Sequence, residues 1–93
     1  MKELTWFYMK GCPYCAQAGR ALEELKKENP SYENVSIHQI DENAEPETAD
    51  KYDYYSVPSI FLGDEKLYEA HRGEGYEECK GHVKAALDKA MSE

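Results

Sequence analysis

The chain has 93 residues, 41% hydrophobic and 32% charged, which is enough for one hydrophobic core and little more. Its formal net charge of −8 argues against nucleic acid as a partner, because phosphate binding needs clustered Lys and Arg. No apolar run approaches the roughly 20 residues that cross a bilayer, and the N-terminus lacks a signal-peptide cleavage pattern, so we expect one cytoplasmic domain over residues 1–93 with no membrane contact.

The first 40 residues predict a strand, a helix and a second strand. Residues 4–9, LTWFYM, are rich in aromatic and β-forming side chains and end at a Lys-Gly turn, which is typical of a buried strand. From Pro13 to about Glu28 the sequence predicts a helix, ended at Asn29-Pro30-Ser31 because proline cannot continue it. The apolar face of this helix carries Cys15, Ala18, Leu22 and Leu25. Residues 35–40, VSIHQI, predict the second strand.

The remaining residues predict a short helix, a hairpin and a last helix. The short helix lies between residues 44 and 52, and strands are expected over residues 59–62 and 66–71, joined by a tight turn at Gly63-Asp64-Glu65. Gly73 and Gly75 precede the last helix, whose apolar stripe is Cys79, Val83, Ala86, Leu87 and Ala90. The order β-α-β-α-β-β-α predicts an α/β fold with one mixed four-stranded sheet covered by three helices.

Two cysteines, Cys12 and Cys15, lie three residues apart in KGCPYC, where the first helix is expected to begin. Unpaired backbone N–H groups and the positive end of the helix macrodipole favour a thiolate at Cys12, and the thiolate is the reactive form. Lys10 adds a positive charge nearby, and Pro13 suits the first helical position. Cys15, on the apolar face, is expected to be buried. This asymmetry suits thiol–disulfide exchange, in which Cys12 attacks a disulfide and Cys15 resolves the mixed disulfide.

A metal site is the alternative for the cysteine pair. Structural zinc usually needs four ligands, often two Cys pairs. The other candidates are Cys79, His38, His71 and His82, and only Cys79 and His82 share a helical spacing. Cys79 is better explained as a small apolar residue in the last helix, so we expect no metal site and no bound cofactor.

The motif Cys12-Pro13-Tyr14-Cys15 between a strand and a helix resembles the active site of dithiol glutaredoxins, and Ser56-Val57-Pro58-Ser59 before a strand resembles the proline loop of glutaredoxins and thioredoxins. The element order is similar to the minimal thioredoxin fold. The resemblance implies a disulfide reductase in cell redox homeostasis and electron transport, with a redox-active Cys12–Cys15 pair. It also implies a cis Pro58 facing the pair, and substrate contacts from Val57 and Pro58. Pro13 and Tyr14 in the motif are further candidate substrate contacts. Lys10 is expected either to stabilise the Cys12 thiolate or a substrate carboxylate, or to be a solvated surface lysine.

The sequence also differs from both families at several positions. The segment YEAHRGEGYEEC, which begins at Tyr68, lacks the Gly-Gly pair and Asp with which glutaredoxins hold glutathione. The downstream half is more similar to thioredoxin, with Gly73 in the place of the glycine after the last strand, yet Trp6 stands where thioredoxins carry a buried Asp. The reducing equivalents are therefore expected from either glutathione or a thioredoxin-reductase-type flavoprotein, with a slight preference against glutathione.

Three functions are open from the sequence. The first is a monomeric thiol–disulfide oxidoreductase that acts on protein or mixed disulfides, with a reductase or a low-molecular-weight thiol as its other partner. The second is a dimer that holds an iron–sulfur cluster through Cys12 of each chain and two external thiols. The third is a redox-inert interaction domain, against which the intact thiol pair argues.

Secondary candidates surround the proline loop. Tyr14 is either part of a substrate groove or an exposed aromatic, and Arg72 is expected at the surface. Tyr52, Tyr54 and Tyr55 just precede Val57, and packing of the second helix explains them better than a peptide groove.

Overall fold

A computed structural model describes residues 2–93 and contains one mixed sheet. The strands are β1 (Leu4–Tyr8), β2 (Ile37–Asp41), β3 (Ser59–Leu62) and β4 (Glu65–Glu69). Their order is β2-β1-β3-β4, with β1 parallel to β2 and antiparallel to β3, and with β3 antiparallel to β4. The predicted mixed four-stranded sheet is confirmed.

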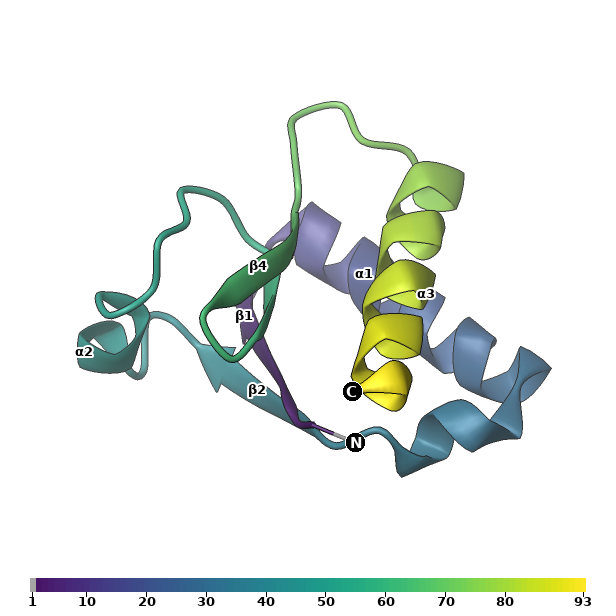
Figure 1. Ribbon diagram of the computed structural model, residues 1–93. Helices are drawn as coiled ribbons and strands as arrows, with labels where there is room; N and C mark the ends of the chain where they lie inside the picture. The colour runs from purple at the N-terminus through teal and green to yellow at the C-terminus, as the bar shows by residue number, and fades with distance from the viewer. Residues whose placement is uncertain (1) are drawn as a thin grey trace.

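The helices lie on the two faces of this sheet (Figure 1). α1 (Pro13–Glu28) and α3 (Tyr76–Ser92) pack together on one face, and the short α2 (Pro46–Ala49) lies on the other. Within residues 2–93 no helix is both long enough and apolar enough to cross a membrane.

Alternation along the strands divides the apolar side chains between two cores. Trp6 and Ile60 belong to the larger core beneath α1 and α3, whereas their neighbours Phe7 and Phe61 belong to a smaller core on the α2 face. Tyr52 and Tyr54 complete the smaller core, with ring centroids 4.8 Å and 4.9 Å from that of Phe7. The packing interpretation of these two tyrosines is therefore confirmed.

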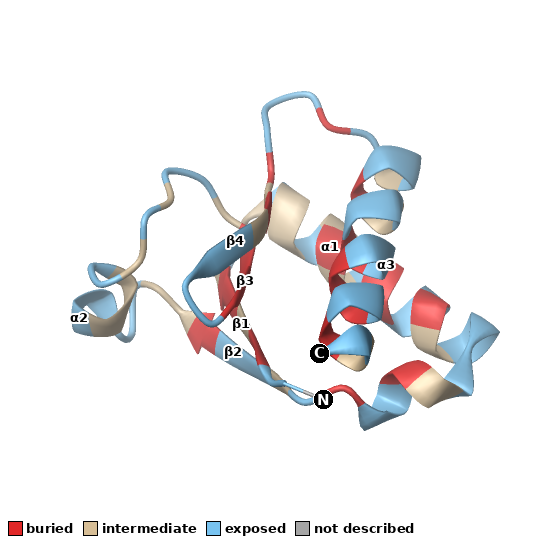
Figure 2. Ribbon diagram, in the orientation of Figure 1, coloured by how far each residue is buried: buried red, intermediate tan, exposed pale blue. Residues whose placement is uncertain are grey.

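The inward face of α3 is the apolar stripe that the sequence predicts (Figure 2). All five of its members are buried: Cys79, Val83, Ala86, Leu87 and Ala90. Cys79 and Leu87 have no exposed surface, so Cys79 is a core residue, as expected.

The second strand begins later than predicted. Residues 35–40 were expected to be extended, but a 3-10 helix (Pro30–Asn34) follows α1 directly and the strand runs over Ile37–Asp41. The side chain of Asn29 starts the 3-10 helix by accepting a hydrogen bond from the Ser31 N–H, and Val35 ends it. Val35 is buried and its backbone is extended, but its N–H donates to the Tyr32 carbonyl, so it ends the 3-10 helix and the pairing with β1 starts at Ile37.

Other boundaries differ by one or two residues. β1 ends at Tyr8 and not at Met9, and the fourth strand is Glu65–Glu69 where residues 66–71 were expected. Glu65 pairs with Leu62, so the hairpin turn is the two residues Gly63-Asp64. Gly63 has a φ of 60°, a backbone conformation that favours glycine. The chain leaves the sheet after Glu69, which places His71 and Arg72 in an exposed loop before α3.

Candidate active site

Cys12 lies at the N-terminus of α1, as the sequence predicts. It is the N-cap residue with an extended backbone, Pro13 follows at the first helical position, and the carbonyl of Cys12 accepts the first helical hydrogen bond from the Ala16 N–H at 3.0 Å. The preceding Gly11 has a φ of 79°, which lets the chain turn sharply out of β1. The half-buried Cys12 sulfur is thus held at the positive end of a 16-residue helix.

Cys15 is less buried than expected. It is half-buried, whereas Ala18, Leu22 and Leu25 on the same face are fully buried, because Cys15 lies only one turn into the helix at the end of the core. Burial is nevertheless the main influence on its thiol and raises the pKa of Cys15 to about 12. The neighbouring Cys12 sulfur adds to this rise. Both residues are free thiols in the structure.

The proline loop approaches the thiols through Val57. The Val57–Pro58 peptide bond is cis, and the Cys12 sulfur lies 3.9 Å from the Val57 carbonyl oxygen. Val57 is half-buried at the surface, while Pro58 is buried. Of the two predicted contact residues in this loop, Val57 is therefore the one with exposed surface beside Cys12.

Cys12 stands between two hollows. One, of about 440 Å³, lies over the start of α1 and is lined by Trp6, Gly11, Pro13, Cys15 and others. Trp6, which stands at the position where thioredoxins carry a buried Asp, is 3% exposed and forms part of the wall of this hollow. The other, which we call the groove, has a volume of about 310 Å³ and is lined by Met9, Cys12, Tyr14, Glu42, Tyr55, Ser56, Val57, Ala70, His71 and Arg72.

Tyr14 connects the thiol motif to the loop before α3. Its hydroxyl oxygen accepts a hydrogen bond of 2.7 Å from the N–H of Gly73, whose φ is 85°. This contact crosses 59 positions of the sequence and fixes the Tyr14 ring in the groove wall. Tyr14 is thus a groove residue and not a free surface aromatic.

Lys10 and Arg72 differ in their position relative to the groove. Both are exposed, but only Arg72 lines the groove, together with His71. Lys10 lines neither hollow beside Cys12. The structure therefore brings Tyr14 and Val57 together at Cys12 and leaves Lys10 outside the groove.

A clamp that the sequence did not reveal holds the far wall of the groove. Glu69, at the end of β4, accepts hydrogen bonds from the backbone N–H groups of Tyr55 (2.5 Å) and Ser56 (2.7 Å). Lys66 pairs with the same carboxylate at 2.8 Å and donates to the Asp53 carbonyl at 3.2 Å. Tyr55, with 92% of its surface exposed, is thereby held at the rim.

Sequence reasoning also missed Glu42 and His71 as groove residues, because only the folded chain brings the ends of β2 and β4 to Cys12. Glu42 follows β2 and accepts a 2.8 Å hydrogen bond from the Tyr54 hydroxyl. The sequence did offer one signal for Glu42 and His71, which is that each lies at or just after the end of a predicted strand, where side chains can reach the edge of the sheet.

A family model described as glutaredoxin matches residues 4–67, which is more than half of the chain. The chain belongs to the glutaredoxin family. The match spans the thiol motif and the proline loop and ends before the segment in which Gly73 contacts Tyr14. The chain is thus a redox protein of the glutaredoxin family, as its thiol motif predicts.

Solved structures show the same fold. Thioredoxin 1 from Thermosipho africanus is 14% identical with a TM-score of 0.58, covering 96% of this chain and 98% of its own. Fasciola hepatica thioredoxin is 21% identical with a TM-score of 0.57, covering 94% of this chain and 78% of its own. A glutaredoxin from Brucella melitensis is 21% identical, with a TM-score of 0.48 and coverages of 96% and 82%. The two thioredoxin matches confirm the predicted thioredoxin fold.

Proposed function

We propose that this protein is a dithiol oxidoreductase that reduces protein disulfides or mixed disulfides through Cys12 and Cys15. The observation that supports this most is the position of Cys12. Its sulfur lies at a helix N-terminus and at the mouth of the groove, with a second free thiol one turn further along α1.

In the first step the Cys12 thiolate attacks one sulfur of the substrate disulfide. A bond forms between Cys12 and that sulfur, the substrate S–S bond breaks, and the departing thiolate takes a proton from solvent. The N-terminus of α1 favours negative charge at Cys12 before the attack.

In the second step Cys15 loses its proton to solvent and attacks the Cys12 sulfur. The Cys12–Cys15 disulfide forms, and the second substrate sulfur leaves as a thiolate that takes a proton from solvent. The substrate disulfide has then been reduced to two thiols, and the Cys12–Cys15 dithiol has been oxidised to a disulfide. Helical spacing keeps the two sulfurs near each other, and the half-burial of Cys15 limits its reaction with anything else.

The groove suits an extended peptide segment better than a small molecule alone. Its walls come from two loops, with Val57 on one side and Arg72 on the other, and the exposed ring of Tyr55 stands at the rim. Backbone groups of Val57 would pair with the substrate in the manner of an added strand, while aromatic rings contact its side chains.

Two electrons and two protons must return to the Cys12–Cys15 disulfide after each cycle. We expect a flavoprotein reductase to supply them faster than glutathione does, since the segment after β4 lacks the Gly-Gly pair and Glu42 adds negative charge to the groove. Comparing re-reduction of the oxidised protein by NADPH with thioredoxin reductase and by glutathione distinguishes the two sources.

The test is disulfide reduction by three single variants. Cys12→Ser should abolish turnover of a protein disulfide such as that of insulin, and Cys15→Ser should accumulate a mixed disulfide visible by mass spectrometry. Cys79→Ala is the matched control, because this third cysteine has no exposed surface, and it should retain turnover. Unchanged turnover in Cys12→Ser would refute the proposal. A coloured dimer after anaerobic purification would instead support the iron–sulfur alternative.

A further inference from the structure

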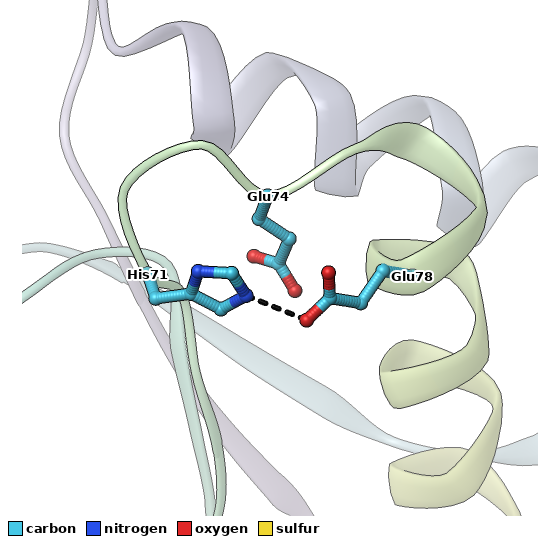
Figure 3. A group of neighbouring side chains, drawn as sticks. All are labelled: His71, Glu74 and Glu78. Carbon is cyan, nitrogen blue, oxygen red and sulfur yellow. Dashed lines mark hydrogen bonds and ion pairs between the residues drawn. The ribbon is translucent and has the colours of Figure 1, made fainter.

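Three potential metal ligands meet between β4 and α3. His71 and Glu74 come from the connecting loop, and Glu78 comes from the first turn of α3 (Figure 3). One ligand atom of each residue lies within 4.8 Å of the other two. This cluster is distinct from the thiol pair and does not depend on the function proposed above.

Glu74 is the unusual member, because it is a carboxylate with only 4% of its surface exposed. Its Oε1 accepts a hydrogen bond of 2.6 Å from the Tyr68 hydroxyl, but its Oε2 is buried and has no hydrogen-bond partner among residues 2–93. A buried carboxylate oxygen without a donor or a positive charge is costly. Figure 3 shows this carboxylate pointing toward the space between the His71 ring and the Glu78 carboxylate.

His71 is oriented as metal-binding histidines commonly are. Its Nδ1 lies 3.1 Å from the carbonyl oxygen of Arg72, and a proton on Nδ1 leaves the Nε2 lone pair free for a metal. Nε2 points at Glu78, with 2.5 Å between the nitrogen and Oε2. Without a metal this contact is a hydrogen bond that needs a proton on Nε2, and a metal ion would take the place of that proton. Metal-binding histidines usually donate their other N–H to a backbone carbonyl or a carboxylate, which fixes the ring.

We propose that His71 Nε2 and the carboxylates of Glu74 and Glu78 bind a divalent first-row transition metal ion such as Zn²⁺. Imidazole and carboxylate donors suit Zn²⁺, whereas Mg²⁺ and Ca²⁺ prefer oxygen donors alone. Donors around one zinc ion lie roughly 3–3.5 Å apart, since each bond is about 2.0–2.2 Å long, so small side-chain rotations close this cluster onto an ion. The ion supplies the positive charge that the buried Glu74 oxygen lacks.

His82 lies beside the cluster, on α3. Its Nε2 lies 3.7 Å from the same Glu78 oxygen that faces His71, and its ring stacks on Tyr68, but His82 is not one of the three clustered ligands. The sequence analysis considered only cysteine and histidine side chains as metal ligands and expected no metal site. Carboxylates were not considered, because nothing in the sequence marks Glu74 as buried. The loop that holds the site also contributes His71 to the groove and Gly73 to the Tyr14 contact, so a bound ion fixes one groove wall.

Zinc binding is measured by titration calorimetry in the full chain carrying Cys12→Ser and Cys15→Ser, so that the thiol pair cannot bind the metal. We expect one equivalent of Zn²⁺, and binding about 10-fold or more weaker after Glu74→Gln, Glu78→Gln or His71→Ala. Glu77→Gln is the matched control, since this exposed carboxylate lies in the same helical turn outside the cluster, and it should bind Zn²⁺ as the parent does. Co²⁺ should show visible absorption that the same three substitutions remove.

The thermal unfolding midpoint gives a second measurement. Saturating Zn²⁺ should raise it in the parent and raise it by less in Glu78→Gln at the same concentration, an exposed substitution that is expected to fold even if Glu74→Gln does not. Absence of saturable Zn²⁺ binding in the parent overturns the proposal. Binding that survives all three ligand substitutions overturns it as well, because the ion then lies elsewhere.

Discussion

The half-burial of Cys15 predicts a steep pH dependence for the second step of the proposed disulfide reduction. Desolvation raises the pKa of the Cys15 thiol to about 12, and the neighbouring Cys12 sulfur adds to the rise. In the mixed disulfide the Cys12 sulfur carries no charge, but the desolvation remains. Because burial keeps the pKa of the Cys15 thiol well above its ordinary value, only a small fraction of Cys15 is then a thiolate at pH 7, and this fraction grows about tenfold with each pH unit.

The assay follows release of thionitrobenzoate from its mixed disulfide with Cys12 by stopped-flow absorbance. Between pH 6 and 9 the release rate should rise by about tenfold per unit, without a plateau, since Cys15 remains mostly protonated throughout. Cys15→Ser is the control and should release none in this step. A rate that levels off below pH 8 would refute the reasoning, because Cys15 would then ionise as an ordinary solvated thiol.

Three further predictions concern contacts that support the site. Tyr14→Phe removes the acceptor of the Gly73 N–H, so this amide should exchange with solvent several-fold faster by NMR, as loss of about 1 kcal/mol implies. Leu87→Ala leaves a cavity in the core and should lower the free energy of unfolding in urea by about 2–5 kcal/mol. A hydrogen bond from Lys84 holds the pKa of Asp88 below its usual value, so this contact stabilises the fold above about pH 4 and is lost as the pH falls through the folded-state pKa. Asp88→Asn should therefore flatten the acid side of the stability curve measured by urea unfolding from pH 2 to 6.

Each of these has an outcome that contradicts it. Unchanged exchange at Gly73 in Tyr14→Phe would mean that the loop is held by other contacts. For Leu87→Ala the control is Lys89→Ala at an exposed position of the same helix, and equal losses in the two variants would contradict the burial argument. An acid limb that stays equally steep in Asp88→Asn would show that other carboxyl groups control it.

The sequence predicts this fold well where local signals agree. Pro13 and the apolar spacing after it place the start of α1, and thus Cys12, because a proline at the first turn and a periodic apolar face are both local features. Val35 is the counterexample. Its backbone is extended, as its propensity favours, but its N–H donates to the Tyr32 carbonyl, so Val35 ends the 3-10 helix and does not pair in the sheet.

In the candidate site, too, contacts between residues close in the sequence were predictable and contacts between distant segments were not. Cys12 and Cys15 are near each other because they are three residues apart, so spacing alone predicts their proximity. The approach of Val57 to Cys12 was expected only from the resemblance to glutaredoxins, and the contact between Tyr14 and Gly73 from nothing at all, since both join distant segments. Glu74 was unpredictable because a carboxylate is normally exposed, and only the Tyr68 hydroxyl in the folded chain explains how half of it is satisfied.

The clamp on the groove wall also affects how the protein behaves at high concentration. β4 is an outermost strand, and an outer strand with free backbone groups can pair with the sheet of another molecule. Lys66 and Glu69 put charge on this edge while they hold the loop around Tyr55. Removing both charges would thus loosen the groove wall and leave an uncharged strand edge at once, so the same two side chains serve the loop geometry and the protection of the sheet edge.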